Sequence, residues 1–283
     1  MSLNILISSD TWPCAAVISA LVELPQVAQI FVAAGDVEAA TKSLPSSSLV
    51  TFFKAEGPHS LFARTGPIDA LFYIPVTGQE GAKGRETIDT SIAHGVKHFV
   101  LGSVDRKGAP EGHVTGVRYF DAMAKLEAYL KEQTVNTHMS WVILQRVFYM
   151  DNINDDFAGK AVCTLWAGLP PGKKLQLVGL KDVGWFAAQT LLDAEKWKGK
   201  EVGMAGDELS FEEADRIYLR LRGSRIPQTW GLVGAGLKWA ISDLRQNFEW
   251  LGTAGHGVDV EKCRGLYPEI QDFENWLKTS SKT

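Results

Sequence analysis

The sequence has little cysteine, no long apolar run and no excess of basic residues, and each absence excludes a class of protein. The three cysteines lie far apart and form no CxxC pair or Cys/His cluster. We therefore expect no metal site, no disulfide framework and a cytoplasmic location. No run of apolar residues is long enough to cross a bilayer, and the N-terminus lacks a basic signal-peptide start, so no membrane contact is expected. The net charge of −4, without blocks of like charge, argues against a nucleic-acid partner.

The chain does contain short runs of β-branched and aromatic residues that alternate with helical patterns. This alternation predicts an α/β fold, a Rossmann-like doubly wound parallel sheet built from βαβ units. We expect this domain over residues 1–152. Residues 153–283 are expected to form mainly a smaller C-terminal α/β region that binds substrate and is interleaved with the sheet. The predicted strands are the run beginning at Leu3 and the segments Gln29–Ala34, Leu49–Ala55, Asp69–Val76, His98–Ser103 and Trp141–Gln145.

Glycine is missing from the turn after the first predicted strand. A dinucleotide needs glycines there, because its pyrophosphate approaches the backbone at that turn. Asp10 adds negative charge and Trp12 adds bulk at this position. We therefore expect no cofactor, with NADP or NAD as the runner-up. If a nucleotide does bind, the degenerate site would use Ser8, Ser9, Asp10, Thr11 and Trp12, with Met123 from a later helix.

Three segments show a family resemblance. Ala93–Val100, Tyr119–Glu127 and Ile143–Asn152 are similar to successive landmarks of the NmrA-like proteins, which are atypical short-chain dehydrogenase/reductases. The resemblance implies a Rossmann domain, a smaller C-terminal domain and a ligand cleft between them. Members of the family include NADP-dependent reductases of flat aromatic or quinone substrates and non-catalytic regulators. Several fungal members act in specialised metabolism.

The departures from the family pattern concern the cofactor. The glycine positions hold Ser9, Trp12 and Ala15, and no arginine follows the second strand. The position of the family's helix lysine is Met123, one turn after Tyr119. Without that lysine, Tyr119 is expected to stay a neutral phenol, which donates a hydrogen bond but is a poor base. The alternative interpretation of Met123 is a core-filling side chain.

Candidate catalytic groups gather after the fifth predicted strand. His113 and Asp105 lie in a polar loop that we expect at the carboxyl edge of the sheet, and imidazole exchanges protons near neutral pH. Ser103 matches the family's serine position, and Tyr119 follows on the next helix. A surface histidine and a strand-end hydroxyl bonded to backbone are the alternative interpretations. The expected substrate contacts are Gln145, Tyr149, Asn152 and Trp166, although core packing is the alternative for the tryptophan.

These features support three functional hypotheses. The first is a non-redox enzyme, a cyclase, isomerase or dehydratase, that acts on a small, flat, apolar metabolite through acid/base groups. The second is an NAD(P)H-dependent reductase of a quinone or aromatic substrate. The third is a non-catalytic regulator or binding module, which would have a protein partner. Fold alone does not choose among them.

Overall fold

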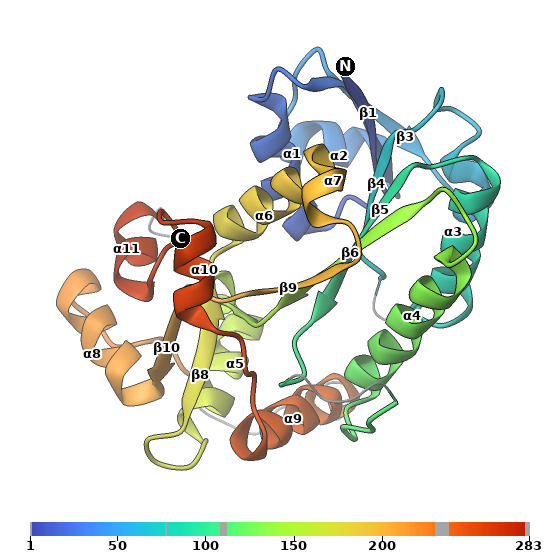
Figure 1. The fold of residues 1–283 in the computed structure, drawn as a ribbon. Coiled ribbons are helices and arrows are strands. Elements are labelled where there is room, and N and C mark those ends of the chain that lie inside the picture. The colour runs from blue at the N-terminus through green and yellow to red at the C-terminus, as the bar shows by residue number, and fades with distance from the viewer. Residues whose placement is uncertain (1, 77, 108–111, 230–237, 281–283) are drawn as a thin grey trace. The chain divides into compact units, whose positions relative to one another are not determined.

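The computed structural model describes residues 2–76, 78–107, 112–229 and 238–280 (Figure 1). The chain divides into two compact units. Unit 1 comprises Met1–Val104, Ala122–Gln145 and Val183–Val202, and unit 2 comprises Asp105–Asp121, Arg146–Asp182 and Gly203–Thr283. The division does not follow a single boundary near residue 152, because each unit takes segments from both halves of the chain.

Unit 1 carries most of a seven-stranded sheet with the order β3-β2-β1-β4-β5-β6-β9. Its own elements are β1 Leu3–Ile7, α1 Trp12–Val22, β2 Val27–Ala34, α2 Val37–Ser43, β3 Val50–Lys54, the 3₁₀ helix η1 Pro58–Leu61, β4 Ala70–Tyr73, α3 Ala82–Ala93, β5 His98–Val104 and α7 Ala194–Trp197. Four elements continue into unit 2: α4 Arg118–Thr134, β6 Ser140–Arg146, α6 Leu180–Leu192 and β9 Lys200–Met204. The predicted doubly wound α/β fold is confirmed.

Strand β1 pairs in parallel with both β2 and β4, so Ile5 lies beside Ile30 on one side and Ala70 on the other. Ile5, Leu6 and Ile7 are fully buried, and burying each side chain stabilises the fold by about 1.5–3 kcal/mol. The strand order reverses between β1 and β4. The carboxyl ends of these two strands therefore form the edge at which such sheets place ligands.

Glycines allow the helices of unit 1 to approach closely. On α6, a Cβ at Gly184 would lie 2.4 Å from the carbonyl oxygen of Ala16 on α1. On α3, a Cβ at Gly84 would lie 2.9 Å from the methyl carbons of Leu126 on α4. The α1–α6 pair and the α3–α4 pair lie on opposite sides of the sheet in Figure 1. The sheet of unit 1 is thus covered on both faces, as a buried parallel sheet requires.

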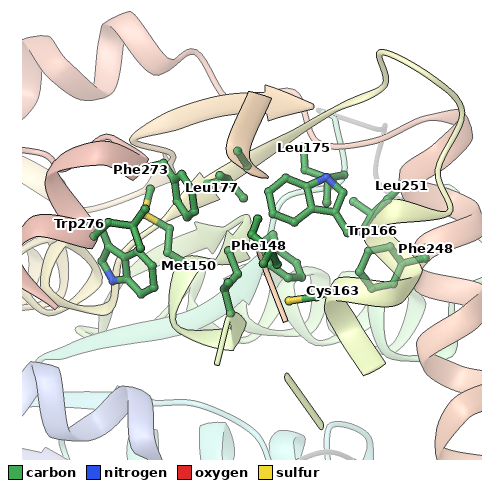
Figure 2. Packing of buried hydrophobic residues seen from close by; sticks show 14 residues of the cluster. Phe148, Met150, Cys163, Trp166, Leu175, Leu177, Phe248, Leu251, Phe273 and Trp276 are labelled. Atoms are coloured by element: carbon green, nitrogen blue, oxygen red, sulfur yellow. The ribbon is translucent and has the colours of Figure 1, made fainter. Parts of the chain in front are cut away.

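Unit 2 is built on a three-stranded sheet of order β10-β8-β7, in which β8 is antiparallel to β10 and parallel to β7. Aromatic and aliphatic side chains pack against it, among them Trp166, Phe248 and Phe273 (Figure 2). The elements of this unit are β7 Phe148–Tyr149, the 3₁₀ helix η2 Met150–Asn152, α5 Phe157–Ala167, β8 Lys174–Val178, β10 Asp207–Ser210, α8 Phe211–Arg222, α9 Lys238–Thr253, α10 Val260–Leu266 and α11 Phe273–Thr279.

Helix ends show where local sequence signals decide structure. The Ser210 hydroxyl accepts the amide of Glu213 at 3.2 Å, and the Glu213 carboxylate accepts the amide of Ser210 at 2.8 Å. This reciprocal capping box starts α8. Helix α6 begins at Leu180. Asp182 lies inside the first turn and is fully buried.

Candidate functional site

The turn after β1, Ser8–Thr11, is closed by its own side chains. The amide of Ser8 donates to the carbonyl of Phe72 at 3.1 Å. The Ser9 hydroxyl lies 3.0 Å from the Thr11 hydroxyl and 3.4 Å from the Cys14 sulfur. In a glycine-rich turn the backbone at these positions is accessible to a phosphate. In this chain the side chains of Ser9, Thr11 and Cys14 stand there and contact one another. The side chain of Trp12 lies outside the described part of the structure.

Asp10 places a carboxylate at this edge of the sheet. Its Oδ2 accepts the amide of Gly35, which follows β2, at 3.1 Å. The neighbouring Asp36 accepts the amide of Ala39 at 3.0 Å and caps α2. These two acidic side chains thus accept one amide directly after β2 and one in the first turn of α2, and no arginine is present in this stretch. Negative charge at this point disfavours an anionic ligand.

The helix position one turn after Tyr119 is apolar and closed to solvent. Met123 on α4 is fully buried, and Glu127, one further turn along, is 3% exposed. The Ser103 hydroxyl at the end of β5 donates a hydrogen bond to the Glu127 carboxylate. Ser103 is therefore a bonded strand-end hydroxyl, and Met123 fills the core of unit 1.

In unit 2, the end of β6 places a cation between two phenols. The Arg146 guanidinium carbon lies 4.7 Å from the ring centroid of Tyr149 and 5.9 Å from that of Tyr119. One guanidinium nitrogen donates to the carbonyl of Val147 at 3.3 Å. Burial acts to lower the pKa of Arg146, but the Tyr149 and Tyr119 phenol oxygens outweigh burial and raise this pKa. The side chain is therefore a permanent cation. We call Arg146, Tyr119 and Tyr149 the Arg146 cluster.

Asp105 begins unit 2 and joins the Arg146 cluster through the backbone, because its amide donates to the carbonyl of Arg146 at 2.9 Å. Its carboxylate accepts the amides of Gly257 at 2.8 Å and Lys107 at 3.0 Å. Burial acts to raise the pKa of Asp105, but hydrogen bonds from His256, Gly257 and Lys107 outweigh burial and lower it. Asp105 is therefore an ionised anchor for the segment that follows α9.

His256 completes this arrangement, and its side chain is only 3% exposed. Its Nδ1 lies 2.9 Å from the carbonyl oxygen of Asp105 and 3.6 Å from the carboxylate of the same residue. Both neighbours are acceptors, so Nδ1 carries the proton. The imidazole packs 5.5 Å from the Trp250 ring and 6.4 Å from the Phe120 ring. The buried imidazole of this site is thus His256, which sequence reasoning missed.

The remaining predicted residues are His113, Gln145, Asn152 and Trp166. His113 is exposed, between β5 and α4. Gln145 donates to Glu201 at 2.9 Å in unit 1, and Asn152 ends η2. Trp166, expected as a substrate contact, is 1% exposed and packs against Phe148 and Phe211 in the core of unit 2. The core-packing alternative therefore describes it. Among the described residues no cluster of His, Cys, Asp or Glu is arranged to hold a metal.

The sequence of this chain matches one family of known proteins. A profile described as the NmrA-like family matches residues 25–277. The chain belongs to the NmrA-like family. The expectation from the sequence landmarks is confirmed. A comparison with curated proteins finds no match.

Solved structures with the same fold have low sequence identity to this NmrA-like chain. Triphenylmethane reductase of Citrobacter sp. complexed with NADP(H) has a TM-score of 0.75 at 14% identity, over 98% of this chain and 100% of that chain. The NADPH-dependent quinone oxidoreductase QOR2 of Escherichia coli complexed with NADPH has a TM-score of 0.71 at 18% identity, over 97% and 98%. NmrA, a negative transcriptional regulator, in complex with NAD has a TM-score of 0.70 at 14% identity, over 98% and 95%. These likenesses show the fold.

A nicotinamide dinucleotide, which such neighbours hold, fits the residues of this chain poorly. One feature favours a polar ligand, because the buried Ser8 hydroxyl oxygen has no hydrogen-bond partner among the described residues. Against it stand the Asp10 carboxylate on the Gly35 amide and the buried Met123 where a lysine would hold the ribose. The amide of Ser8 in the turn already donates to the Phe72 carbonyl. No helix of the described chain is long and apolar enough to cross a membrane.

Proposed function

We propose that this NmrA-like protein acts on a small, flat, largely apolar metabolite without transferring a hydride. The observation that carries the proposal is the Asp10 carboxylate, which accepts the Gly35 amide at the edge where a pyrophosphate would bind. The reaction class is proton transfer in a cyclisation, isomerisation or dehydration, which needs no external oxidant or reductant. The expected setting is cytoplasmic.

The Arg146 cluster supplies groups suited to such a reaction. The Tyr119 phenol can donate a proton or a hydrogen bond to a substrate oxygen, and the Arg146 guanidinium 5.9 Å from the ring centroid stabilises negative charge that develops there. In the family pattern a lysine at position 123 supplies a positive charge on the helix of the tyrosine. In this chain we propose that Arg146, at the end of strand β6, supplies the positive charge instead. Asp105 holds the same stretch of backbone through its amide.

The decisive experiment is nucleotide binding by the whole chain. Calorimetric titration with NADPH, NADH and their oxidised forms is expected to show no binding tighter than about 100 µM. Binding below that value, together with consumption of NADPH in the presence of a quinone, overturns the proposal and establishes a reductase instead.

A pair of variants tests the physical reason. Asp10→Asn removes the charge at the turn after β1, and NADPH affinity is expected to rise by about tenfold, because a like charge beside the pyrophosphate disappears. Asp193→Asn is the matched control, because Asp193 caps α7 elsewhere in unit 1 and asparagine caps a helix as well as aspartate does. Equal affinity in both variants means that Asp10 is not what excludes the nucleotide.

A non-catalytic regulator is the second candidate, favoured by the likeness to NmrA, a negative transcriptional regulator. This hypothesis predicts a protein partner that binds the Tyr119→Phe variant as tightly as it binds the natural chain. Loss of a measured turnover in Tyr119→Phe, with the fold retained, favours the enzyme.

A further inference from the structure

We propose that the Arg146 cluster of unit 2 binds the carboxylate of an aromatic acid. The inference deepens the proposed function, because it names a charged group of the substrate. It rests on the proposed function in one respect, namely that the ligand is a small molecule. Its test measures binding in the absence of any nucleotide, so each idea can fail without the other.

The first argument is the number of unused donors. A guanidinium has five N–H groups in a fixed plane. In Arg146 one donates to the Val147 carbonyl at 3.3 Å, and another is directed at the Tyr119 phenol. No other acceptor among the described residues takes the remaining donors. The residue as a whole is half-buried, and these remaining donors are the ones that we expect a ligand to use.

The second argument is uncompensated charge. Within the described residues no carboxylate forms an ion pair with Arg146. Asp105, whose amide donates to the Arg146 carbonyl, has a carboxylate that is already committed to the amides of Gly257 and Lys107 and to His256. A half-buried cation without a counter-charge costs free energy, and an anionic ligand would offset that cost.

The third argument identifies the ligand class. A guanidinium binds a planar carboxylate through two parallel hydrogen bonds, a geometry that a lysine cannot reproduce. The surroundings are aromatic: the Tyr149 ring lies 4.7 Å from the cation, and Phe120, next to Tyr119, stacks edge-on against Trp250 at 4.9 Å. Such rings favour contact with a flat, apolar body. An aromatic acid combines both features.

The experiment measures binding of benzoate, cinnamate and 1-naphthoate to the purified full chain by calorimetry, with benzamide as the uncharged analogue. We expect at least one acid to bind in the millimolar range or tighter. Arg146→Gln is expected to weaken it by about tenfold or more, as loss of a charge-assisted hydrogen bond predicts. Arg146→Lys should restore only part of the affinity, because it keeps the charge but not the planar donors.

The matched control is Arg85→Gln. Arg85 is an exposed arginine of unit 1 whose guanidinium lies 5.8 Å from the Tyr129 ring, so it reproduces the cation–ring contact elsewhere. This variant should bind the acids as the natural chain does. No binding of any of the acids to folded protein, or equal binding in Arg146→Gln, overturns the inference. Binding of phenyl phosphate in preference to every carboxylate also overturns it and reassigns the cluster to phosphate.

Discussion

A buried carboxyl group in the first turn of α6 is expected to make unit 2 less stable as pH rises. Asp182 is fully buried, and its Oδ2 accepts the Gln271 amide at 3.2 Å. Its Oδ1 has no hydrogen-bond partner among the described residues. Burial raises the pKa of Asp182 from 3.8 to about 7, and the nearby Asp151, whose own pKa is also raised by burial, adds to the effect. The folded chain therefore keeps this proton where the unfolded chain loses it.

The magnitude follows from the difference between folded and unfolded pKa. Below pH 4 both states are protonated and the group contributes no pH dependence. Between pH 4 and 7 only the folded state holds the proton, so the free energy of unfolding falls by about 1.4 kcal/mol for each pH unit. The rise of the Asp182 pKa from 3.8 to about 7 gives a total loss of about 4 kcal/mol, complete above pH 7.

Hydrogen exchange followed by mass spectrometry is the appropriate assay, because it reports on segments of unit 2 separately. Protection of the segment around Gln271 and α11 should fall from pH 5 to pH 8 after correction for intrinsic exchange rates. Asp182→Asn cannot ionise, so it should remove most of this fall and exceed the natural chain in stability at pH 8. The control Asp272→Asn keeps its helix cap and should behave as the natural chain. Unchanged protection across this range, or the same fall in Asp182→Asn, refutes the reasoning.

Three further predictions concern unit 1. Gly184→Ala should destabilise by about 1–3 kcal/mol in urea unfolding, because its Cβ would lie 2.4 Å from the Ala16 carbonyl oxygen. Ser103→Ala should cost about 1–3 kcal/mol in the same assay, since it removes a donor from the buried Glu127 carboxylate. Burial lowers the pKa of His98 from 6.5 to about 4, so unit 1 should lose up to about 3 kcal/mol as pH falls from 6.5 to 4, and His98→Gln should abolish that loss in hydrogen exchange.

Each of these predictions has a control. Gly265→Ala on α10 adds a methyl group into open space and should leave stability nearly unchanged, so an equal loss in both glycine variants contradicts the packing argument. Glu127→Gln combined with Ser103→Ala should recover part of the lost stability, because an uncharged amide tolerates burial better. The His98 prediction is contradicted if hydrogen exchange shows that unit 1 of the natural chain is as stable at pH 4 as at pH 6.5.

Much of the fold can be predicted from local patterns. Short aliphatic runs such as Leu3–Ile7 form strands, and the capping box at Ser210 starts α8. Such signals depend on residues a few positions apart, so they are written directly in the chain. The missing glycines at Ser8–Thr11 and the methionine at position 123 are equally local, and they predict the absence of a nucleotide cofactor, which the NADPH titration tests.

The candidate site could not be predicted from local patterns, because it is formed by contacts between segments that are distant in the sequence. His256 and Asp105 are separated by 151 positions, and nothing in either local sequence announces their hydrogen bond. The place of Arg146 between Tyr119 and Tyr149 depends on how β6 ends beside α4. The raised pKa of Asp182 has the same origin, because burial by tertiary packing and not the neighbouring sequence removes water from its carboxyl group. Periodicity is a property of neighbouring residues, whereas charge, burial and proximity at a site are properties of the folded chain.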